Sequence, residues 1–250
     1  MSQPTSQKIA FITGGNRGLG YQTALDLGPL DIHVVIGSRD AAKGEEAVNK
    51  LRLAGVIADY LVFDVQNPED HQKAFDHFQA SYGKLDILVN NAGYAEAEFG
   101  SGHIPTVAET TSESLRKHFD INFFEQVALT QTLLPLLLAA PAARIVNLSS
   151  ILGSLTLHAT PGSPIYHSKA FAYDATKTAL NAFTIHLAYD LRDTKIKVNS
   201  AHPGWVKTDM GGPNAMMEVS EGGKTSAELA TLPDDGPTGG FFHLGKPLPW

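Results

Sequence analysis

The regular alternation of short apolar runs with longer helical patterns most constrains how this chain folds. Runs such as AFIT, HVVIGS and ILVN are apolar at most positions, which is typical of parallel strands buried on both faces. Strands that alternate with helices at this period indicate βαβ units and a doubly wound sheet. The chain shows no internal repeat and no linker-like tract. We therefore expect one α/β domain over residues 1–250, with a doubly wound parallel sheet flanked by helices on both faces.

The same pattern gives expected bounds for the elements. The expected strands are Ile9–Thr13, His33–Gly37, Ala58–Phe63, Ile87–Asn90, Arg144–Leu148 and Lys195–Ala201. The expected helices are Leu19–Leu27, Ala41–Leu53, Pro68–Tyr82, Ser112–Leu138 and Ala175–Arg192. Two segments, Ile151–Ala172 and Pro203–Ser226, follow strands but have no clear period. Because ligands of open α/β sheets bind beyond the carboxyl ends of the strands, we expect both segments to border the binding crevice.

Charge and composition argue against several classes of function. A formal net charge of −7 disfavours nucleic acid or an anionic membrane as a partner. The chain has no cysteine and its ten histidines are scattered, so we expect no disulfide, no cysteine nucleophile and no metal site. The first residues, MSQPTSQK, do not resemble a signal peptide. The apolar run Ala128–Ala143 is too short and too interrupted to span a bilayer, and we expect a cytoplasmic protein.

A glycine-rich turn, TGGNRGLG at residues 13–20, connects the first expected strand to the first expected helix. Gly14, Gly15, Gly18 and Gly20 permit a tight turn and close approach of the backbone to a phosphate. The helix N-terminus that follows supplies amide donors and a partial positive charge. The spacing is TGxxxGxG and not GxGxxG, but the preceding strand and following helix are the context that a dinucleotide site requires.

The residues that follow the second expected strand favour one nicotinamide cofactor over the other. An acidic residue there would bind the adenosine ribose, whereas arginine would accept a 2′-phosphate. The chain has Ser38 and Arg39 at this point, with Arg17 inside the glycine turn. Two guanidinium groups can form strong charge-assisted contacts with one phosphate. Asp40 competes with this interpretation, but we expect it to cap the helix Ala41–Leu53. We therefore predict NADPH rather than NADH.

Tyr173 and Lys177 are spaced four residues apart in the segment YDATKTALNAFT. This spacing places both side chains on one face of a helix, one turn apart. A neighbouring ammonium favours the phenolate, so we expect the pKa of Tyr173 to be lowered. Near-neutral acidity would need about 4 kcal/mol, which a second cation such as a bound nicotinamide ring would help to supply.

Further motifs follow one another in a fixed order along the chain. They are Asp64-Val65, NNAG at 90–93, Asn122 in DINFFEQ, RIVNLSS ending at Ser150, and Pro203-Gly204 with Val206 and Thr208. Together with the glycine turn and the Tyr–Lys pair, they resemble the short-chain dehydrogenase/reductase superfamily over nearly the whole chain. The resemblance implies a Rossmann-type sheet and a nicotinamide cofactor.

The resemblance also implies which residues form the site. It implies that Asn122, Ser150, Tyr173 and Lys177 are catalytic. The residues implied to bind the cofactor are Gly14, Asn16, Arg17, Gly18, Leu19, Gly20, Ser38, Arg39, Asp64, Val65, Asn91, Ala92, Gly93, Tyr173, Lys177, Pro203, Gly204, Val206 and Thr208.

The resemblance divides the catalytic work among four side chains. Tyr173 acts as the general acid that protonates the substrate oxygen, and Ser150 donates a hydrogen bond to the same oxygen. Lys177 binds the nicotinamide ribose and shifts the acidity of Tyr173. Asn122 holds a water that reconnects the proton path to solvent.

Two alternatives to these assignments remain open at the sequence level. Ser149 precedes Ser150 and would face the other side of a strand. Tyr166 is a rival phenol, although its lysine, Lys169, is three residues on and not four. We prefer Ser150 by alignment and treat Tyr166 as a possible wall of the pocket.

The C-terminal third is similar to the NADPH-dependent carbonyl reductase branch, through HPGWVKTDMGGP, SAELATLPDDGPTGGFF and Trp250. This resemblance implies a small-molecule carbonyl substrate, a ketone or aldehyde of hydrophobic or aromatic character. We expect substrate-site loops near 94–105, 151–172 and 205–220. The candidate pocket residues are Tyr94, Phe99, Ile151, Leu152, Tyr166, Trp205, Met210, Met216 and Met217.

Assembly and activity class each keep alternatives. The 22 residues between Ser150 and Tyr173 exceed the usual family spacing, so the sequence leaves open a monomer or a homo-oligomer, either dimer or tetramer. The main alternative function is an NADP(H)-binding redox sensor with little turnover. A second alternative is a member that performs dehydration or epimerisation with a retained cofactor. The complete set of expected catalytic residues favours a reductase.

Overall fold

An eight-stranded sheet lies at the centre of the computed structural model, which describes residues 7–96 and 103–250. Its strand order is β3-β2-β1-β4-β5-β6-β7-β8, and every pairing is parallel except that of β7 with β8. The strands are β1 Lys8–Ile12, β2 Ile32–Ser38, β3 Ala58–Val62, β4 Ile87–Asn90, β5 Arg144–Leu148, β6 Lys197–Ala201, β7 Phe241–His243 and β8 Lys246–Pro247. The order reverses at β1 and β4, which is the switch point where ligands of such sheets bind.

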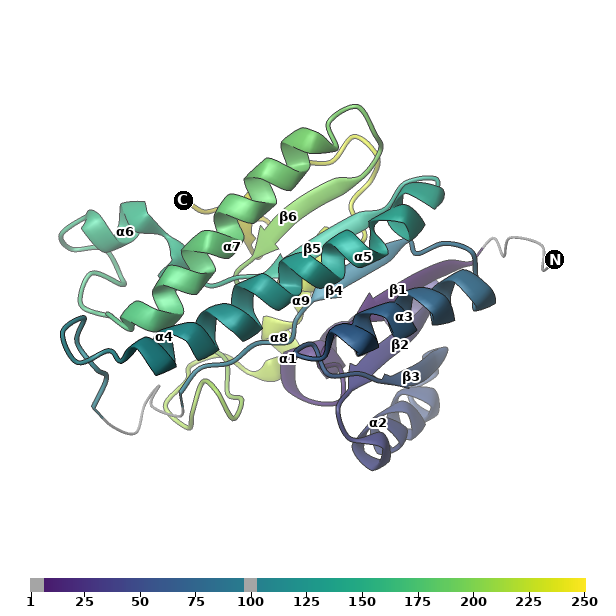
Figure 1. Cartoon of the computed structure of the whole chain (residues 1–250), viewed down its shortest axis with the longest axis horizontal. Coiled ribbons are helices and arrows are strands. Elements are labelled where there is room, and N and C mark those ends of the chain that lie inside the picture. Colours follow the sequence, from purple (N-terminus) through teal and green to yellow (C-terminus); the bar gives the residue numbers. More distant parts are fainter. Residues whose placement is uncertain (1–6, 97–102) are drawn as a thin grey trace.

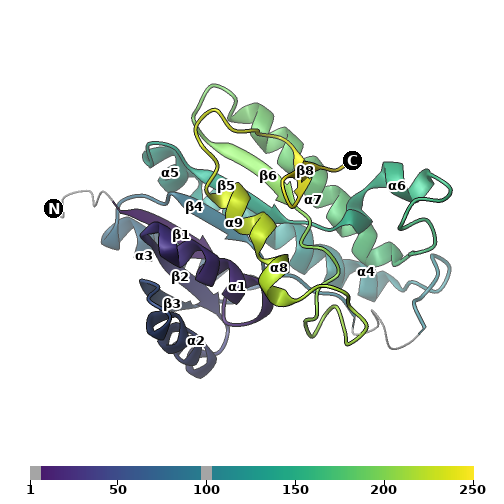
Figure 2. The same ribbon diagram turned by 180° about the vertical axis from the view of Figure 1, so that it is seen from behind.

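Helices cover both faces of this sheet (Figures 1 and 2). One face carries α3, α5 and α7, and the other carries α1, α2 and α9. The helices are α1 Gly18–Leu27, α2 Ala41–Leu53, α3 Pro68–Ser81, α4 Ser112–Phe119, α5 Glu125–Ala139, α6 Leu155–Ala159, α7 Phe171–Asp190, α8 Val219–Gly222 and α9 Lys224–Ala230. Three shorter helical segments are η1 Gly28–Leu30, η2 Asp120–Phe124 and η3 Ile151–Gly153. The predicted doubly wound parallel sheet is thereby confirmed, with one antiparallel strand added at its edge.

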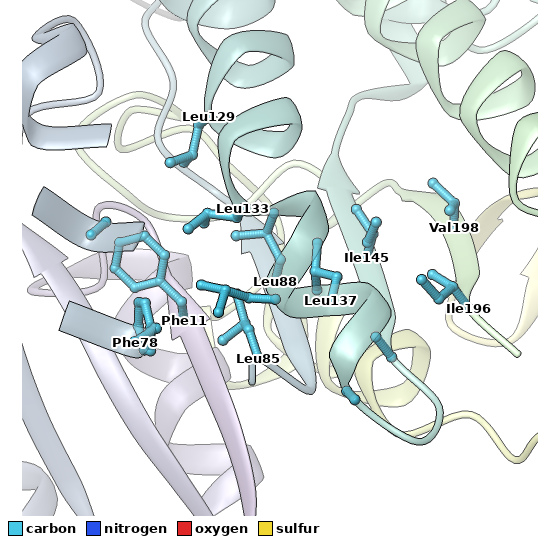
Figure 3. Close-up of a cluster of buried hydrophobic side chains, with 14 of the residues drawn as sticks. Phe11, Phe78, Leu85, Leu88, Leu129, Leu133, Leu137, Ile145, Ile196 and Val198 are labelled. Atoms are coloured by element: carbon cyan, nitrogen blue, oxygen red, sulfur yellow. The ribbon is translucent and has the colours of Figure 1, made fainter. Parts of the chain in front are cut away.

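Two separate apolar cores hold the layers together. On one face Phe11, Phe78 and Leu88 pack with leucines of α5 (Figure 3). On the other face Ile36 and Leu51 pack among residues of α1, α2 and α9. Because strands β1, β2, β4 and β5 contribute to both cores, their side chains are apolar on both faces. This explains the continuous apolar runs in the sequence.

Local signals account for several helix starts. Asp40 caps α2, since its carboxylate accepts a hydrogen bond from the Lys43 amide at 3.1 Å. The predicted role of Asp40 as an N-cap is therefore confirmed. Asn67 caps α3 in the same way, and Pro68 occupies the first helical turn, where its missing N–H costs nothing.

Most element ends differ from the expectation by at most two residues, as in β6, which begins at Lys197 and not at Lys195. Larger differences occur in three places. The single helix expected over Ser112–Leu138 is divided, because the π-helical turn η2 separates α4 from α5. Helix α7 begins at Phe171 and not at Ala175, so it includes Tyr173. The irregular segments and the C-terminal region contain α6, α8, α9, β7 and β8, all seven residues or shorter.

The continuous helical stretch Ser112–Ala139 is long and apolar enough, by length and composition alone, to cross a membrane. Within the fold its apolar side chains serve the core instead. Leu129, Leu133 and Leu137 are fully buried against the sheet. We interpret this stretch as a core helix.

Candidate active site

The glycine-rich turn lies beside the NNAG segment at the switch point of the sheet. Gly14 and Gly18 have φ angles of +63° and +54°, in the left-handed region that favours glycine. A Cβ at Gly20 would lie 2.5 Å from the Asn91 amide nitrogen. That nitrogen donates to the Thr13 carbonyl at 2.7 Å and to the Gly14 carbonyl at 3.2 Å. The Asn91 side chain thus fixes the glycine-rich turn to the NNAG segment.

The Thr13 hydroxyl connects the same two segments. It accepts hydrogen bonds from the Asn91 and Ala92 amides at 3.0 and 2.9 Å. Just beyond, Gly93 lies near the two catalytic candidates Asn122 and Lys177. A Cβ at Gly93 would be 3.5 Å from Asn122 Oδ1 and 3.8 Å from Lys177 Nζ. The expected cofactor segment 91–93 therefore leads directly to the expected catalytic groups.

An open cavity lies between the glycine turn and the N-terminus of α2. Its lining residues are Asn16, Arg17, Ser38, Arg39, Asp40 and Lys43. The three basic side chains make this cavity suited to a phosphate ester. Sequence reasoning anticipated Arg17 and Arg39 but missed Lys43, although its position one turn into the expected helix was a usable signal. Ser38 is buried, and its hydroxyl donates to the Asp40 carbonyl at 2.8 Å.

Arg17 also has a partner within the protein. Its guanidinium pairs with the carboxylate of Asp209, which belongs to the loop after β6. Both side chains are largely exposed, at 68% and 80%, so the pair contributes little to stability. Its effect is to connect the glycine turn to the 205–220 loop.

The remaining expected cofactor residues flank this region. Val65 is buried in the core, whereas Asp64 accepts a hydrogen bond from the Gln66 amide at 3.1 Å. Leu19 packs against the backbone of Gly222 in α8. A Cβ added at Gly222 would lie 2.7 Å from Leu19 Cδ2. Val65 and Leu19 therefore pack against other residues, and Asp64 is the one charged residue of these three.

Tyr173 and Lys177 lie one turn apart on α7, facing the end of β5. The Lys177 ammonium is 5.5 Å from the centroid of the Tyr173 ring and donates to the Leu148 carbonyl at 2.8 Å. Ser150 follows β5, and its side chain hydrogen-bonds with Tyr173. The three side chains therefore converge, as the sequence predicted.

Burial changes the acidity of both groups on α7. It raises the pKa of Tyr173, against the lowering effect of the hydrogen bond with Ser150, and the Asp174 charge adds to the rise. Burial also lowers the pKa of Lys177 to about 8. The expected net lowering of the pKa of Tyr173 is thus wrong for the protein alone, because desolvation of the phenolate dominates.

The neighbouring Ser149 has a different environment. Its hydroxyl donates to Asn181 Oδ1 on α7 at 2.7 Å, and the side chain is buried. Ser149 is therefore engaged in packing β5 against α7. Ser150 remains the serine that contacts Tyr173.

Asn122 lies in the π-helical turn η2, and its amide is fully engaged. Its Oδ1 accepts from the Tyr94 amide at 2.7 Å, and its Nδ2 donates to the Tyr94 carbonyl at 2.8 Å. The same Nδ2 lies 3.2 Å from the Thr176 hydroxyl on α7. Asn122 therefore joins three segments around the site: the chain after β4, η2 and α7. π-helical turns of this kind occur frequently at functional sites.

A row of buried polar side chains connects the strands next to the site with α7. Asn90 donates to Asn147 at 2.8 Å, and Asn147 donates to the Thr184 hydroxyl at 2.8 Å. Thr184 and Ser200 share a further hydrogen bond of 2.8 Å. Because these residues come from β4, β5, α7 and β6, the row fixes these elements relative to one another.

The segment after β6 lies between Met217 and the glycine-rich turn. Gly204 has a φ of +92° and packs against Met217, and Val206 is buried and pairs with Met217 in a β-bridge. Thr208 lies close to Gly18. A Cβ added at Gly18 would be 3.6 Å from the Thr208 methyl group. The expected nicotinamide segment, Pro203–Thr208, is therefore next to the glycine turn.

His202, which sequence reasoning did not select, joins this segment to the serine. Its Nδ1 accepts from the Ile151 amide at 3.1 Å and from the Gly204 amide at 3.4 Å. Burial, followed by the neighbouring His243, lowers the pKa of His202 to about 3, so the ring is neutral. The signal available in the sequence was its position directly before Pro203-Gly204.

A second cavity opens beside Tyr173, on the side of α4. Its lining residues are Glu96, Ile104, Pro105, Thr110, Ser114, His118, Ala170, Phe171, Ala172 and Tyr173. None of the described residues expected to form the pocket is among them. Phe99, which was also expected there, lies outside the described residues.

The expected pocket residues are distributed around the site. The Tyr94 ring contacts the His118 ring in a tilted arrangement, with ring centroids 4.9 Å apart. Trp205, Met210 and Met216 are exposed on the 205–220 loop. Tyr166 lies beside Lys169, whose ammonium donates to the His158 carbonyl.

Comparison with known proteins places these features in a family. The model of the short chain dehydrogenase family matches residues 8–218. Carbonyl reductase 1 (NADPH) of Mus musculus is 32% identical over 98% of this chain and 99% of its own length. Salutaridine reductase of Papaver bracteatum is 31% identical over 97% and 96%. The solved structure of NADPH-bound carbonyl reductase from chicken fatty liver has a TM-score of 0.83 at 26% identity, covering 98% and 100%.

Proposed function

Because the chain belongs to the short chain dehydrogenase family, we propose that it reduces a hydrophobic or aromatic ketone or aldehyde to an alcohol with NADPH. The observation that carries this proposal is the convergence of Ser150, Tyr173 and Lys177 beside the glycine-rich turn. Relatives named as NADPH carbonyl reductases, similar over nearly their whole length, support the same reading. A sensor of redox state would have no need of these three groups together.

The residues present suit a bound NADPH. Gly14 and Gly18 adopt left-handed φ angles, and no side chain among the described residues caps the N-terminus of α1, so the first amides of this helix would be available to a pyrophosphate. We propose that Arg17, Arg39 and Lys43 hold the adenosine 2′-phosphate in the cavity that they line. When bound, the nicotinamide supplies the hydride, which is chemistry that the protein side chains cannot provide.

The protein side chains would handle the proton and the developing charge. We propose that the Tyr173 hydroxyl gives its proton to the carbonyl oxygen as that oxygen becomes an alkoxide. Burial keeps Tyr173 protonated at neutral pH, as a general acid must be. Ser150 would donate a hydrogen bond to the same oxygen and stabilise charge that forms in the transition state.

Lys177 and Asn122 would act on either side of this pair. The ammonium of Lys177 lies near Gly93, where it would reach the ribose of the cofactor and stabilise the tyrosinate left after proton transfer. Since the Asn122 amide is engaged with Tyr94 and Thr176, any water that Asn122 holds would bind its main-chain carbonyl. The loops near 94–105, 151–172 and 205–220 would border the substrate.

The test is the loss of reduced-nicotinamide absorbance with an activated aryl ketone. We expect turnover with NADPH, and we expect Tyr173→Phe to lower kcat by about 100-fold or more while NADPH still binds. Near-normal turnover by Tyr173→Phe would remove Tyr173 from the mechanism. Tight NADPH binding without oxidation across a broad carbonyl panel would instead favour a sensor or a non-redox member.

The phosphate site has its own test. Replacing Arg39 by Asp together with Arg17 by Ala should shift the preference from NADPH towards NADH, because both guanidinium contacts to the 2′-phosphate are lost. The control is Arg192→Ala, an exposed arginine on the turn after α7. If the double variant retained its NADPH preference, the phosphate would have to bind elsewhere.

A further inference from the structure

The cavity beside Tyr173 indicates what the substrate carries besides its carbonyl group. Resting on the function proposed above, we infer that the substrate is an apolar ketone or aldehyde with a protonated amine, and that Glu96 binds this amine.

The cavity lies between three segments of the chain: the loop after β4, helix α4 and the first turn of α7. Tyr173 forms part of the wall, so a ligand in the cavity lies directly against the expected general acid. Half of the lining is apolar, and these residues are Ile104, Pro105, Ala170, Phe171 and Ala172. Such walls favour a hydrocarbon skeleton.

The polar part of the lining consists mainly of hydrogen-bond acceptors. His118 Nδ1 lies 2.8 Å from the Ser114 carbonyl oxygen, which can only accept, so Nδ1 carries the proton. The tautomer with its proton on Nδ1 offers Nε2 as an acceptor. Thr110 donates its hydroxyl proton to the Thr106 carbonyl at 2.9 Å, which leaves only lone pairs for a ligand. Glu96 adds a carboxylate, and the hydroxyls that could donate to a ligand are those of Ser114 and of Tyr173, the expected general acid.

No lysine or arginine is among the lining residues to offset this carboxylate. Residues 94–111 contain no lysine and no arginine in the sequence, but three glutamates. Lys117 on α4 lies over the Tyr94 ring, 4.4 Å from its centroid, and Lys169 is hydrogen-bonded to His158. A wall with one carboxylate, several acceptors and no lysine or arginine matches a ligand that donates hydrogen bonds and carries positive charge.

The overall charge acts in the same direction. A net charge of −7 attracts a cationic substrate and raises its local concentration. A charge-assisted hydrogen bond between an ammonium and a half-buried carboxylate corresponds to about tenfold or more in binding. The amine should therefore be visible as a preference between two otherwise identical substrates.

The experiment compares an aryl ketone bearing a dimethylaminoethyl chain with its 3-methylbutyl analogue, which has the same shape without the charge. We expect the wild-type enzyme to favour the amine by about tenfold or more in kcat/KM. Glu96→Gln should abolish this preference while leaving the neutral ketone within about twofold. Glu113→Gln, which removes an exposed carboxylate from the first turn of α4, is the matched control and should retain the preference.

Two results would overturn the inference: equal use of both ketones by the wild type, or an equal loss for both in Glu96→Gln. If neither ketone is reduced, calorimetric binding of the two compounds decides instead. Tighter binding of the amine that disappears in Glu96→Gln would support the amine site and count only against the reductase function. Equal binding would reject the amine site itself.

Discussion

Replacing Lys177 by methionine tests how much unfolding free energy is lost by burying an ammonium beside Tyr173. Lys177 is buried, and burial lowers its pKa from 10.5 to about 8. The two values differ by 2.5, so a protonated Lys177 costs the folded state about 3 kcal/mol at neutral pH. Methionine keeps the long apolar stem and removes the charge.

The sign of the pH dependence follows from this difference. Between pH 8 and 10.5 the unfolded chain binds more protons at this lysine than the folded protein does, so stability rises with pH. Integrating the two titrations, about 2 kcal/mol of the cost is recovered between roughly pH 7 and 9.5. The methionine variant has no group at this position to titrate, and it should lack this rise.

The assay is reversible urea unfolding of the cofactor-free protein at several pH values. The quantity to compare is the difference in unfolding free energy between wild type and Lys177→Met, because other titrating groups cancel in the difference. The loss of the hydrogen bond to Leu148 shifts that difference by a constant and leaves its slope unchanged. Lys246→Met, at an exposed lysine in β8, is the control. A flat difference across this range would refute the reasoning, since it would mean that the buried ammonium is fully compensated.

Three further predictions concern residues around the site. Burial raises the pKa of Asp174 to about 7, above its ordinary 3.8, so its contribution to stability should fall as the pH rises through this window; unfolding of Asp174→Asn between pH 4 and 7 should lack this fall. His202→Ala should lower stability by about 2–4 kcal/mol, because the Ile151 and Gly204 amides lose their acceptor, and His202→Asn should lose less; denaturant unfolding of both variants checks this. Gly20→Ala should weaken NADPH binding and lower stability by about 1–3 kcal/mol, because its Cβ would displace the Asn91 amide; calorimetric titration with NADPH measures the effect.

The sheet could be predicted well because its strands carry their own signals. The bounds of β4 and β5 match the expectation, since each strand is followed directly by a polar residue, Asn91 after β4 and Ser149 after β5. The short edge strands β7 and β8 could not be predicted in this way. They contain three and two residues, too few to show a period, and they form because β6 offers β7 a free edge.

The convergence of Ser150, Tyr173 and Lys177 could also be predicted, because the spacing of four places Tyr173 and Lys177 on one face of a helix and the family resemblance selects Ser150. The acidity of Tyr173 was not accessible. Spacing identifies the nearby cation, but the sign of the pKa change depends on how deeply the phenol is buried, which only the fold determines. The engagement of the Asn122 amide with the Tyr94 backbone is equally a matter of tertiary contact.

The π-helical turn η2 has a consequence for how this chain can vary in length. Each residue turns an α-helix by about 100°, and η2 accommodates one more residue than an α-helical turn would. Deleting a single residue between Asp120 and Phe124 would close this turn into an ordinary α-helical one, and α4 and α5 would keep nearly their present faces. Leu129 and Leu133 could then still face the sheet, but the wider turn would no longer hold Asn122 against the Tyr94 backbone. Shortening η2 should therefore spare the core and disturb the site.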